Sequence, residues 1–175
     1  LGDVLQAQVR GIDADVVQVD EANVTGHPED GRIAAAGINR VLEGVRHEKA
    51  VHLCYGNYGG QTIQKGTYER LIEFLNLLRC DHVVLEIARR PEHELELLKD
   101  VRPEIGLGIG VIDIKDNEVE SAEVVARRIE RAAKILGVDR VRYVHPDCGF
   151  WMLPRSASDA KMRSLVAGRD LFAGR

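Results

Sequence analysis

Side chains that can bind a metal or move a proton recur in this sequence at the ends of short apolar segments. Asp20 and Glu21 end the first such segment, and His52 and Cys54 lie in the second. The later segments lead to the remaining candidates, which are Glu86, Asp113, His145, Asp147 and Cys148. In parallel α/β folds the carboxyl ends of the strands share one rim, and active sites are built on that rim. The spacing therefore predicts one site assembled from several strand ends.

His52 and Cys54 are two residues apart on a predicted strand, so both side chains leave the same face of that strand. Alone, this pair is better explained as a core histidine beside a small buried cysteine. Glu86 and Cys148 change the interpretation because they bring a carboxylate and a second thiolate to the same rim. Two Cys, one His and one Glu form a tetrahedral set suited to Zn²⁺, and sulfur ligands disfavour Mg²⁺ or Ca²⁺. The four residues together therefore predict a zinc site.

A carboxylate in this ligand set indicates a reactive metal rather than a structural one, because closed structural sites usually contain only Cys and His. An incoming thiol could bind the ion as a thiolate, since coordination to Zn²⁺ deprotonates thiols whose free pKa is about 8.5. The chemistry that the set favours is alkylation of a thiol. The third cysteine, Cys80, follows an apolar segment and is expected to be semi-buried at a helix end.

The elements that must position these residues are visible in the hydrophobic pattern. Apolar segments of strand length alternate with longer amphipathic segments, which indicates parallel strands joined by helices. The expected strands are residues 16–19, 50–54, 82–87, 105–112 and 140–144. The expected helices lie near residues 32–45, 66–78, 91–101, 121–136 and 158–172, with a helix end at the N-terminus. Such an α/β pattern suits either a doubly wound sheet or a segment of a (β/α)₈ barrel, and periodicity does not choose between them.

The composition is that of one globular domain of 175 residues, 45% of them hydrophobic and 30% charged. A net charge of -4, with Lys and Arg scattered among acidic residues, argues against nucleic acid as a partner. No apolar segment approaches the roughly 20 residues that span a membrane, and the first residues lack the pattern of a signal peptide. We therefore expect a cytoplasmic protein. Three widely spaced cysteines argue against a disulfide framework.

Five motifs at these strand ends resemble those of the cobalamin-independent methionine synthase family. They read QVDE (18–21), HLCY (52–55), VVLE (83–86), GVID (110–113) and HPDCG (145–149). The family patterns are Q-x-D-E, H-x-C-Y, a strand ending in Glu, G-x-x-D and N-P-D-C-G, in the same order. The resemblance implies a TIM-type (β/α)₈ barrel, of which this chain covers roughly strands 4 to 8. Residues 1–175 would then be the C-terminal portion of a single catalytic barrel domain, with about three β–α units upstream.

The resemblance also implies roles for individual residues. The zinc ligands would be His52, Cys54, Glu86 and Cys148. Asp20 matches an acidic residue that holds the amino group of homocysteine, and Glu21 follows it in the same substrate-binding motif. Asp113 lies in the motif beneath the site, where it is either structural or orients a ligand. Lys115 stands where the folate-dependent branch has a histidine that assists methyl transfer, so Asp113 and Lys115 are the candidate catalytic residues.

The activity that the resemblance implies is methyl transfer to the thiol of homocysteine, which forms methionine. Lys115 makes the chain more similar to the short core relatives, whose donor is a methylated corrinoid protein, than to the enzymes that use methyltetrahydrofolate. Epoxyalkane:coenzyme M transferases are one alternative, because they also activate a thiol on zinc and often carry Gly-Asn after the H-x-C motif, as in Gly56-Asn57 here. Another is a non-catalytic zinc-binding barrel fragment, whose exposed strand edges would make it self-associate.

Several further residues carry expectations of their own. The surface or helix-flanking histidines are expected to be His27, His47, His82 and His93. His145 is expected to donate a hydrogen bond near the site, and Trp151 to pack over the barrel mouth. Gly59 and Gly60 predict a loop near the metal rim. The GLGIG stretch (106–110) lies inside a strand with no helix start after it, which predicts close packing and not dinucleotide binding.

Overall fold

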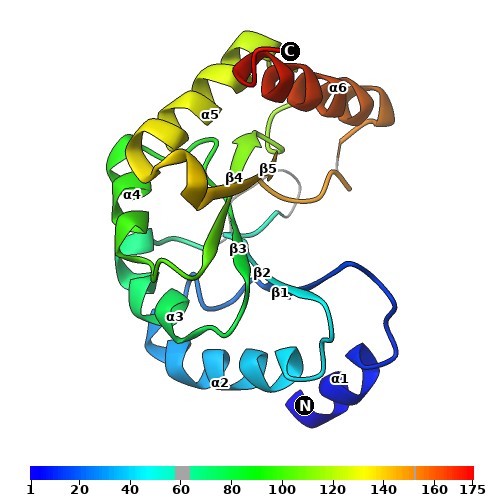
Figure 1. Ribbon diagram of the computed structural model, residues 1–175, viewed down its shortest axis with the longest axis vertical. Helices are drawn as coiled ribbons and strands as arrows, with labels where there is room; N and C mark the ends of the chain where they lie inside the picture. The colour runs from blue at the N-terminus through cyan, green and yellow to red at the C-terminus, as the bar shows by residue number, and fades with distance from the viewer. Residues whose placement is uncertain (58–63, 152) are drawn as a thin grey trace.

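The computed structural model describes residues 1–57, 64–151 and 153–175 (Figure 1). Its strands are β1 Val16–Glu21, β2 Glu48–Leu53, β3 His82–Leu85, β4 Gly106–Ile112 and β5 Val141–Pro146. Its α-helices are α1 Gly2–Val9, α2 Gly31–Leu42, α3 Ile72–Leu77, α4 Glu92–Leu97, α5 Ala122–Leu136 and α6 Arg155–Phe172. Short 3₁₀ helices lie at Pro28–Asp30, Tyr68–Leu71, Leu98–Asp100 and Val138–Arg140. The loop predicted at Gly59 and Gly60 lies outside the described residues.

The strands form one parallel sheet in which the hydrogen-bonded order β1-β2-β3-β4-β5 equals the order along the chain. A doubly wound sheet reverses its strand order and carries helices on both faces. Sequential parallel strands with helices on one side instead build a barrel. Figure 1 shows helices α2 to α6 as an arc around the outer side of the strands. The prediction of a TIM-type barrel is thus confirmed, and the described residues supply five of its strands.

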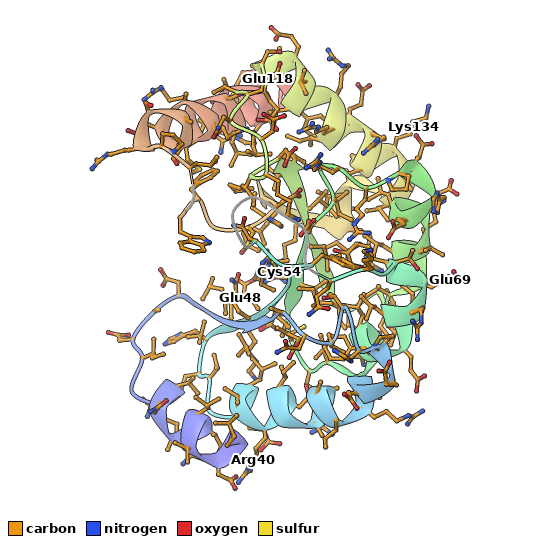
Figure 2. All side chains as sticks on the ribbon, turned by 180° about the vertical axis from the view of Figure 1, so that it is seen from behind. Arg40, Glu48, Cys54, Glu69, Glu118 and Lys134 are labelled. Atoms are coloured by element: carbon orange, nitrogen blue, oxygen red, sulfur yellow. The ribbon has the colours of Figure 1, made fainter. Side chains whose placement is uncertain are left out.

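The two faces of this sheet differ in chemistry because alternate residues of a strand point to opposite faces. The outward residues pack against the helices and are at most 7% exposed: Val17, Val51, Leu53, Val83, Leu85, Leu107, Ile109 and Val111. On the inner face the register places Asp20 beside His52, and His52 beside Val84. The apolar core therefore lies between sheet and helices, and the inner face carries polar side chains. In Figure 2, Cys54 lies centrally, whereas Arg40, Glu69 and Lys134 lie on the outer side.

Helix α5 shows how local sequence signals produce these elements. The Ser121 side chain accepts a hydrogen bond from the Val124 amide (3.4 Å), which caps the first turn. Gly137 ends the helix with a φ of 93°, a conformation that glycine adopts readily. Between them Val125 and Ile129 are buried on the stripe that faces the sheet. The helix predicted at 121–136 is confirmed. No helix in the described ranges is long and apolar enough to cross a membrane.

The helix predicted at 66–78 is shorter in the structure, where a 3₁₀ helix precedes a brief α3. The cause lies at Tyr68, whose side chain is fully buried. Its amide donates to Glu94 Oε2 (3.0 Å) and its hydroxyl donates to the carbonyl oxygen of Glu86 (3.2 Å). These two bonds tie the start of the segment to neighbouring β–α units, so the regular α-helix begins only at Ile72.

The surface position predicted for His82 is wrong. The residue begins β3 and is only 4% exposed. Its Nδ1 lies 3.0 Å from Glu48 Oε1, and its ring packs against Tyr143 with 4.6 Å between the ring centroids. A strand start in a barrel faces inward on alternate residues, so a histidine there can be buried even though a loop precedes it.

Candidate metal centre

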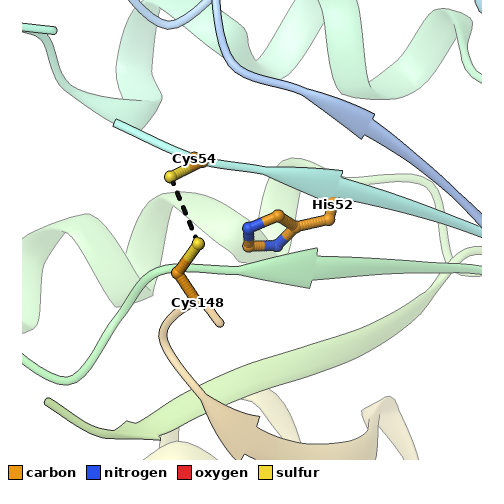
Figure 3. A group of neighbouring side chains, drawn as sticks. All are labelled: His52, Cys54 and Cys148. Carbon is orange, nitrogen blue, oxygen red and sulfur yellow. Dashed lines mark hydrogen bonds between the residues drawn. The ribbon is translucent and has the colours of Figure 1, made fainter. Parts of the chain in front are cut away.

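His52, Cys54 and Cys148 meet at the carboxyl end of β2, as Figure 3 shows. One ring nitrogen and two sulfur atoms lie within 4.8 Å of one another. The two Sγ atoms are 3.6 Å apart, although their residues are separated by 94 positions in the chain. Two thiolates bound to one tetrahedral zinc at the usual Zn–S distance would be separated by about 3.8 Å. The donor atoms therefore have the types and the spacing that Zn²⁺ requires.

The ring of His52 is oriented by the neighbouring strand. Its Nδ1 lies 3.1 Å from the carbonyl oxygen of Val84. Because a carbonyl oxygen only accepts, Nδ1 donates in this contact and Nε2 remains as the metal-binding atom. Burial alone would lower the pKa of His52. The hydrogen bond to Cys148 and the negative charges of Cys148 and Asp20 outweigh the effect of burial, so the pKa of His52 is raised.

The two thiols have opposite acidities. The Cys54 thiol donates to Cys148 Sγ, and the Gly56 amide donates to Cys54 Sγ at 3.2 Å. Hydrogen bonds from Cys54 and His52 lower the pKa of the Cys148 thiol to about 4. The same contact with Cys148, together with burial, raises the pKa of Cys54 far above its usual range. The pair thus presents one thiolate at neutral pH, and the thiolate is the form that binds metals.

Glu86 lies next to this group, but its carboxylate has other partners. One oxygen forms an ion pair with Lys115 Nζ, and the other accepts the Tyr55 amide hydrogen at 3.3 Å. The Glu86 and Lys115 side chains are only 4% and 2% exposed. The structure therefore brings three of the four predicted ligands together and places the fourth beside them in a buried salt bridge.

Asp113 follows β4 and shapes the turn that carries Lys115. Its Oδ1 accepts the Lys115 amide hydrogen (2.8 Å), and its Oδ2 lies 3.4 Å from Nε of Arg89. Its own amide donates to Glu120 Oε1 (2.7 Å). Such an aspartate turn fixes the backbone two residues on. Asp113 therefore fixes the backbone of Lys115, and the Lys115 side chain pairs with Glu86.

Asp20 and Glu21 differ in what they contact. Asp20 is exposed, is paired in register with His52 and accepts a hydrogen bond from Nε2 of Gln18 (2.7 Å). Glu21 Oε1 instead accepts the amide hydrogens of Asn23 (2.6 Å) and Val24 (2.9 Å). Asp20 presents its carboxylate on the inner face near His52, whereas Glu21 holds the turn after β1.

Asp147 has a structural role that the sequence motif did not reveal. It is 1% exposed, and its Oδ1 accepts the amide hydrogens of Ile87 and Ala88 at 2.9 Å each. Burial raises the pKa of Asp147 to about 7. The segment of Cys148 is thereby joined to the segment that follows Glu86. The pairing links residues about 60 positions apart, so it could not be found in one sequence without an alignment.

The glycine-rich strand β4 makes room for this contact. A Cβ atom on Gly110 would collide with Oδ1 of Asp147 and lie 2.8 Å from the carbonyl oxygen of Leu85. A Cβ on Gly108 would lie 3.1 Å from Nε2 of His145. The prediction that GLGIG serves close packing is therefore confirmed.

Three other residues lie near the rim. Asn57 Nδ2 donates to the carbonyl oxygen of Gly149 (3.1 Å), which joins the loops after β2 and β5. His145 Nδ1 lies 2.7 Å from the carbonyl oxygen of Pro146, so the hydrogen bond predicted for it goes to the backbone. Trp151 is 69% exposed. The packing over the barrel mouth predicted for it is not seen among the described residues, which supply five strands of the barrel.

The chain is similar to known proteins over most of its length. Residues 1–169 match the family described as "Cobalamin-independent synthase, Catalytic domain". A methionine synthase from Thermococcus kodakarensis is 31% identical over 158 residues, which are 90% of this chain and 44% of that protein. A methionine synthase from Pyrococcus horikoshii is 26% identical over 155 residues, 89% of this chain and 42% of its own length. The chain thus spans less than half the length of these relatives.

A solved structure supports the fold independently. The B12-independent methionine synthase from Shewanella sp. W3-18-1, solved in complex with selenomethionine, superposes with a TM-score of 0.83 at 24% sequence identity. The superposition covers 99% of this chain and 53% of that one. The barrel topology, the cluster of His52, Cys54 and Cys148 and the match over residues 1–169 agree. The chain belongs to the family of cobalamin-independent synthase catalytic domains.

Proposed function

We propose that this chain provides the zinc-binding, thiol-activating part of a methyltransferase of the cobalamin-independent methionine synthase type. The observation that carries the proposal is the group of one imidazole nitrogen and two sulfur atoms within 4.8 Å, at strand ends of a barrel of this family. When bound, Zn²⁺ would lower the pKa of a substrate thiol so that it reacts as a thiolate at neutral pH. The acceptor would be homocysteine and the product methionine.

His52, Cys54 and Cys148 would hold the ion, with Glu86 as the fourth predicted ligand. Soft sulfur ligands favour Zn²⁺ over Mg²⁺ and Ca²⁺. The contact between Nδ1 of His52 and the Val84 carbonyl (3.1 Å) supports this assignment, because metal-binding histidines are usually held through their other nitrogen.

The remaining polar residues would bind and orient the reactants. Asp20, on the strand beside His52, would hold the amino group of homocysteine, while Glu21 keeps the turn after β1 in place. Asp113 and Lys115 are the candidate catalytic residues, in the turn after β4. The methyl donor would be a methylated corrinoid protein or methyltetrahydrofolate, and Lys115 in place of a histidine favours the corrinoid protein.

We further propose that residues 1–175 are the C-terminal portion of a single catalytic barrel, roughly its strands 4 to 8. Two observations support this. The strands run in sequential order, as in a barrel. The solved relative is covered to 53% of its length by a superposition that includes 99% of this chain.

Metal analysis tests the zinc assignment. Purified protein is expected to contain about one zinc per chain, as structural and catalytic sites with two thiolates bind tightly. Cys54→Ser and Cys148→Ser should each lose most of it. Cys80→Ser is the matched control, because Cys80 lies outside the group and is also half-buried. Equal zinc content in all four proteins would show that the metal, if any, lies elsewhere.

Substrate assays test the rest of the proposal. In the complete barrel that contains this chain, homocysteine should be methylated when methylcobalamin or methyltetrahydrofolate is supplied, and Asp20→Asn should raise the KM for homocysteine more than it lowers kcat. Turnover of coenzyme M with an epoxide, without methylation of homocysteine, would instead assign the chain to thiol alkylation of the epoxyalkane type.

A further inference from the structure

The Glu120 carboxylate connects the turn after β4 with the last two helices of the chain. Its side chain is 9% exposed and lies just before α5. One oxygen accepts the Asp113 amide hydrogen (2.7 Å) and a hydrogen bond from Nη1 of Arg128 (2.9 Å). The other lies 2.8 Å from Nζ of Lys161, which belongs to α6. One carboxylate therefore joins the turn that carries Asp113 and Lys115 to both α5 and α6.

Lys161 is fully buried, and its ammonium group contacts the segment that precedes α5. Its side chain is 0% exposed, and Nζ donates to the Glu120 carboxylate and to the backbone carbonyl of Glu118. The hydroxyl of Ser164, also on α6, donates to the backbone carbonyl of Glu120. Burying an ammonium group is costly, and an apolar side chain of similar size would pack α6 at lower cost. The charge of Lys161 therefore indicates a role in holding residues 118–120 in place.

Glu120 keeps its own charge in spite of its burial. Burial alone would raise the pKa of Glu120, but hydrogen bonds from Lys161, the Asp113 amide and Arg128 outweigh it, so the pKa is lowered. The carboxylate is therefore ionised at neutral pH. Hydrogen bonds to an ionised group are roughly twice as strong as neutral ones, so Glu120 holds the Asp113 amide more firmly than a neutral acceptor would.

The turn after β4 passes this restraint on to Lys115. Asp113 Oδ1 accepts the Lys115 amide hydrogen at 2.8 Å. Arg128 adds a second tie to the same strand end, since its Nη1 also donates to the Val111 carbonyl oxygen (2.8 Å). The backbone of the turn is thus fixed from α5 and α6, which lie against each other on the outer side of the strands (Figure 1).

We propose that Lys161 is a positioning residue: through Glu120 it holds the backbone of Asp113 and Lys115 where these candidate catalytic residues act. The inference rests on the proposed methyltransferase function and deepens it, because it gives α6 a part in the reaction. It concerns the backbone of the turn and does not depend on what the Lys115 side chain contacts. The metal-binding group and Asp20 belong to other strand ends, so Lys161 should affect neither zinc content nor binding of homocysteine.

Lys161→Met tests the proposal, because methionine fills nearly the same space without the charge. Misplacing a reacting group by about 1 Å can lower a rate a hundredfold, so kcat should fall by about tenfold to a hundredfold. The KM for homocysteine and the zinc content should change by less than about threefold. Leu165→Ala is the matched control, because Leu165 is a buried residue of α6 that contributes apolar packing. It should reduce stability without lowering kcat more than about threefold.

Glu120→Gln gives an independent comparison, since it removes the charge of the acceptor and leaves Lys161 in place. Its kcat should fall as in Lys161→Met. The double variant should lose little more than either single one, because both substitutions break the same link. If Lys161→Met does not fold, Glu120→Gln alone decides against the Leu165→Ala control.

Amide hydrogen exchange reads the turn directly, in the complete barrel that contains this chain. Exchange at the Asp113 and Lys115 amides should accelerate about tenfold or more in Lys161→Met, relative to the Cys54 amide. The Cys54 amide is a suitable reference because it is bonded to β1 (3.1 Å) and lies on another strand end. In Leu165→Ala these ratios should stay within about threefold of the unchanged protein.

The inference is overturned if Lys161→Met keeps kcat within about twofold, or if exchange at the turn rises no more than in Leu165→Ala. Lys161 would then serve only to hold α6 against α5. A loss of zinc as large as the loss of kcat would overturn it as well. Failure of the proposed function has a different signature, because the unchanged barrel would then methylate no homocysteine. The exchange rates would still decide whether Lys161 fixes the turn.

Discussion

Asp147 joins the two chain segments that carry Glu86 and Cys148. Its carboxylate accepts two amide hydrogens, from Ile87 and Ala88, at 2.9 Å each. Those amides follow Glu86, and Asp147 itself precedes Cys148. One buried side chain therefore fixes the distance between the segment that carries the carboxylate and the segment that carries the thiolate.

Asp147→Ala should weaken metal binding through this link. The substitution leaves the amide groups of Ile87 and Ala88 without their acceptor, which costs roughly 2 to 6 kcal/mol of stability at about 1 to 3 kcal/mol for each group. Asp147→Asn retains an acceptor oxygen and should lose less than half as much. Urea unfolding measures the stability, and zinc competition with a chelator measures the affinity. A protein with Asp147→Ala that keeps normal zinc affinity would show that the link does not set the geometry.

His82 makes the stability of the fold depend on pH. Its pKa is lowered, mainly by burial, although Glu48 opposes the shift. As the pH falls through about 6.5, His82 therefore becomes protonated in the unfolded chain, whereas in the folded protein it stays neutral until a lower pH. The contribution of His82 to stability is fully present above that pH and declines as the pH falls below it.

His82→Gln should remove part of this dependence. Between about pH 7.5 and about pH 5.5 the unchanged protein should lose more unfolding free energy than the variant. Urea denaturation curves at the two pH values give the comparison. The same loss in both proteins would mean that His82 does not titrate differently in the folded and unfolded states.

At the level of elements, strand β4 requires glycine at position 110. A Cβ atom on Gly110 would have no space, because it would collide with Asp147 Oδ1 and lie 2.8 Å from the Leu85 carbonyl oxygen. Gly110→Ala should therefore destabilise the protein by about 1 to 3 kcal/mol. Gly37, in the exposed part of α2, has nothing within 4 Å of the position that a Cβ atom would take. Gly37→Ala should stabilise by about 0.5 to 1 kcal/mol, because alanine is the better helix former.

Thermal unfolding of these two variants tests the assignment of close packing directly. Opposite shifts in melting temperature are expected. If both substitutions stabilise, β4 is not packed as tightly as the structure indicates and the segment of Asp147 has room to move.

The elements were largely predictable, because their signals are local. The strands at 16–19 and 105–112 and the helix at 121–136 follow from period, capping residue and terminal glycine. The short length of α3 was not predictable, because it depends on two hydrogen bonds between Tyr68 and other β–α units. The burial of His82 was missed for the same reason: its partner Glu48 belongs to a different strand.

The site was predictable to the extent that it depends on strand ends. Placing His52, Cys54 and Cys148 on one rim required only parallel strands, and the structure brings their ligand atoms together. The partner of Glu86 could not be deduced, because the turn that delivers Lys115 depends on where Asp113 directs its two oxygens. Side-chain direction at a turn depends on contacts from several elements, and one sequence without an alignment does not supply them.

At the scale of the whole molecule, helices cover the outer face of the sheet, but the two edges of the sheet are open among the described residues. Helices cover the outward apolar residues, whereas β1 and β5 have one strand neighbour each among the described residues. Val16 on β1 is 40% exposed and Tyr143 on β5 is 41% exposed. Unpaired strand edges present rows of amide and carbonyl groups, which readily pair with another chain.

Residues 1–175 expressed alone should therefore self-associate. The driving force is the pairing of the β1 and β5 edges together with burial of exposed apolar side chains such as Val16 and Trp151, the latter 69% exposed. Sedimentation velocity over a range of protein concentrations should show species larger than the 19.4 kDa monomer, growing with concentration. Val16→Lys should reduce the association, since an inward-pointing charge on an edge strand opposes pairing. A compact monomer at every concentration would contradict the proposal that these strands are part of a larger barrel, because a five-stranded segment with open edges should not remain monomeric alone.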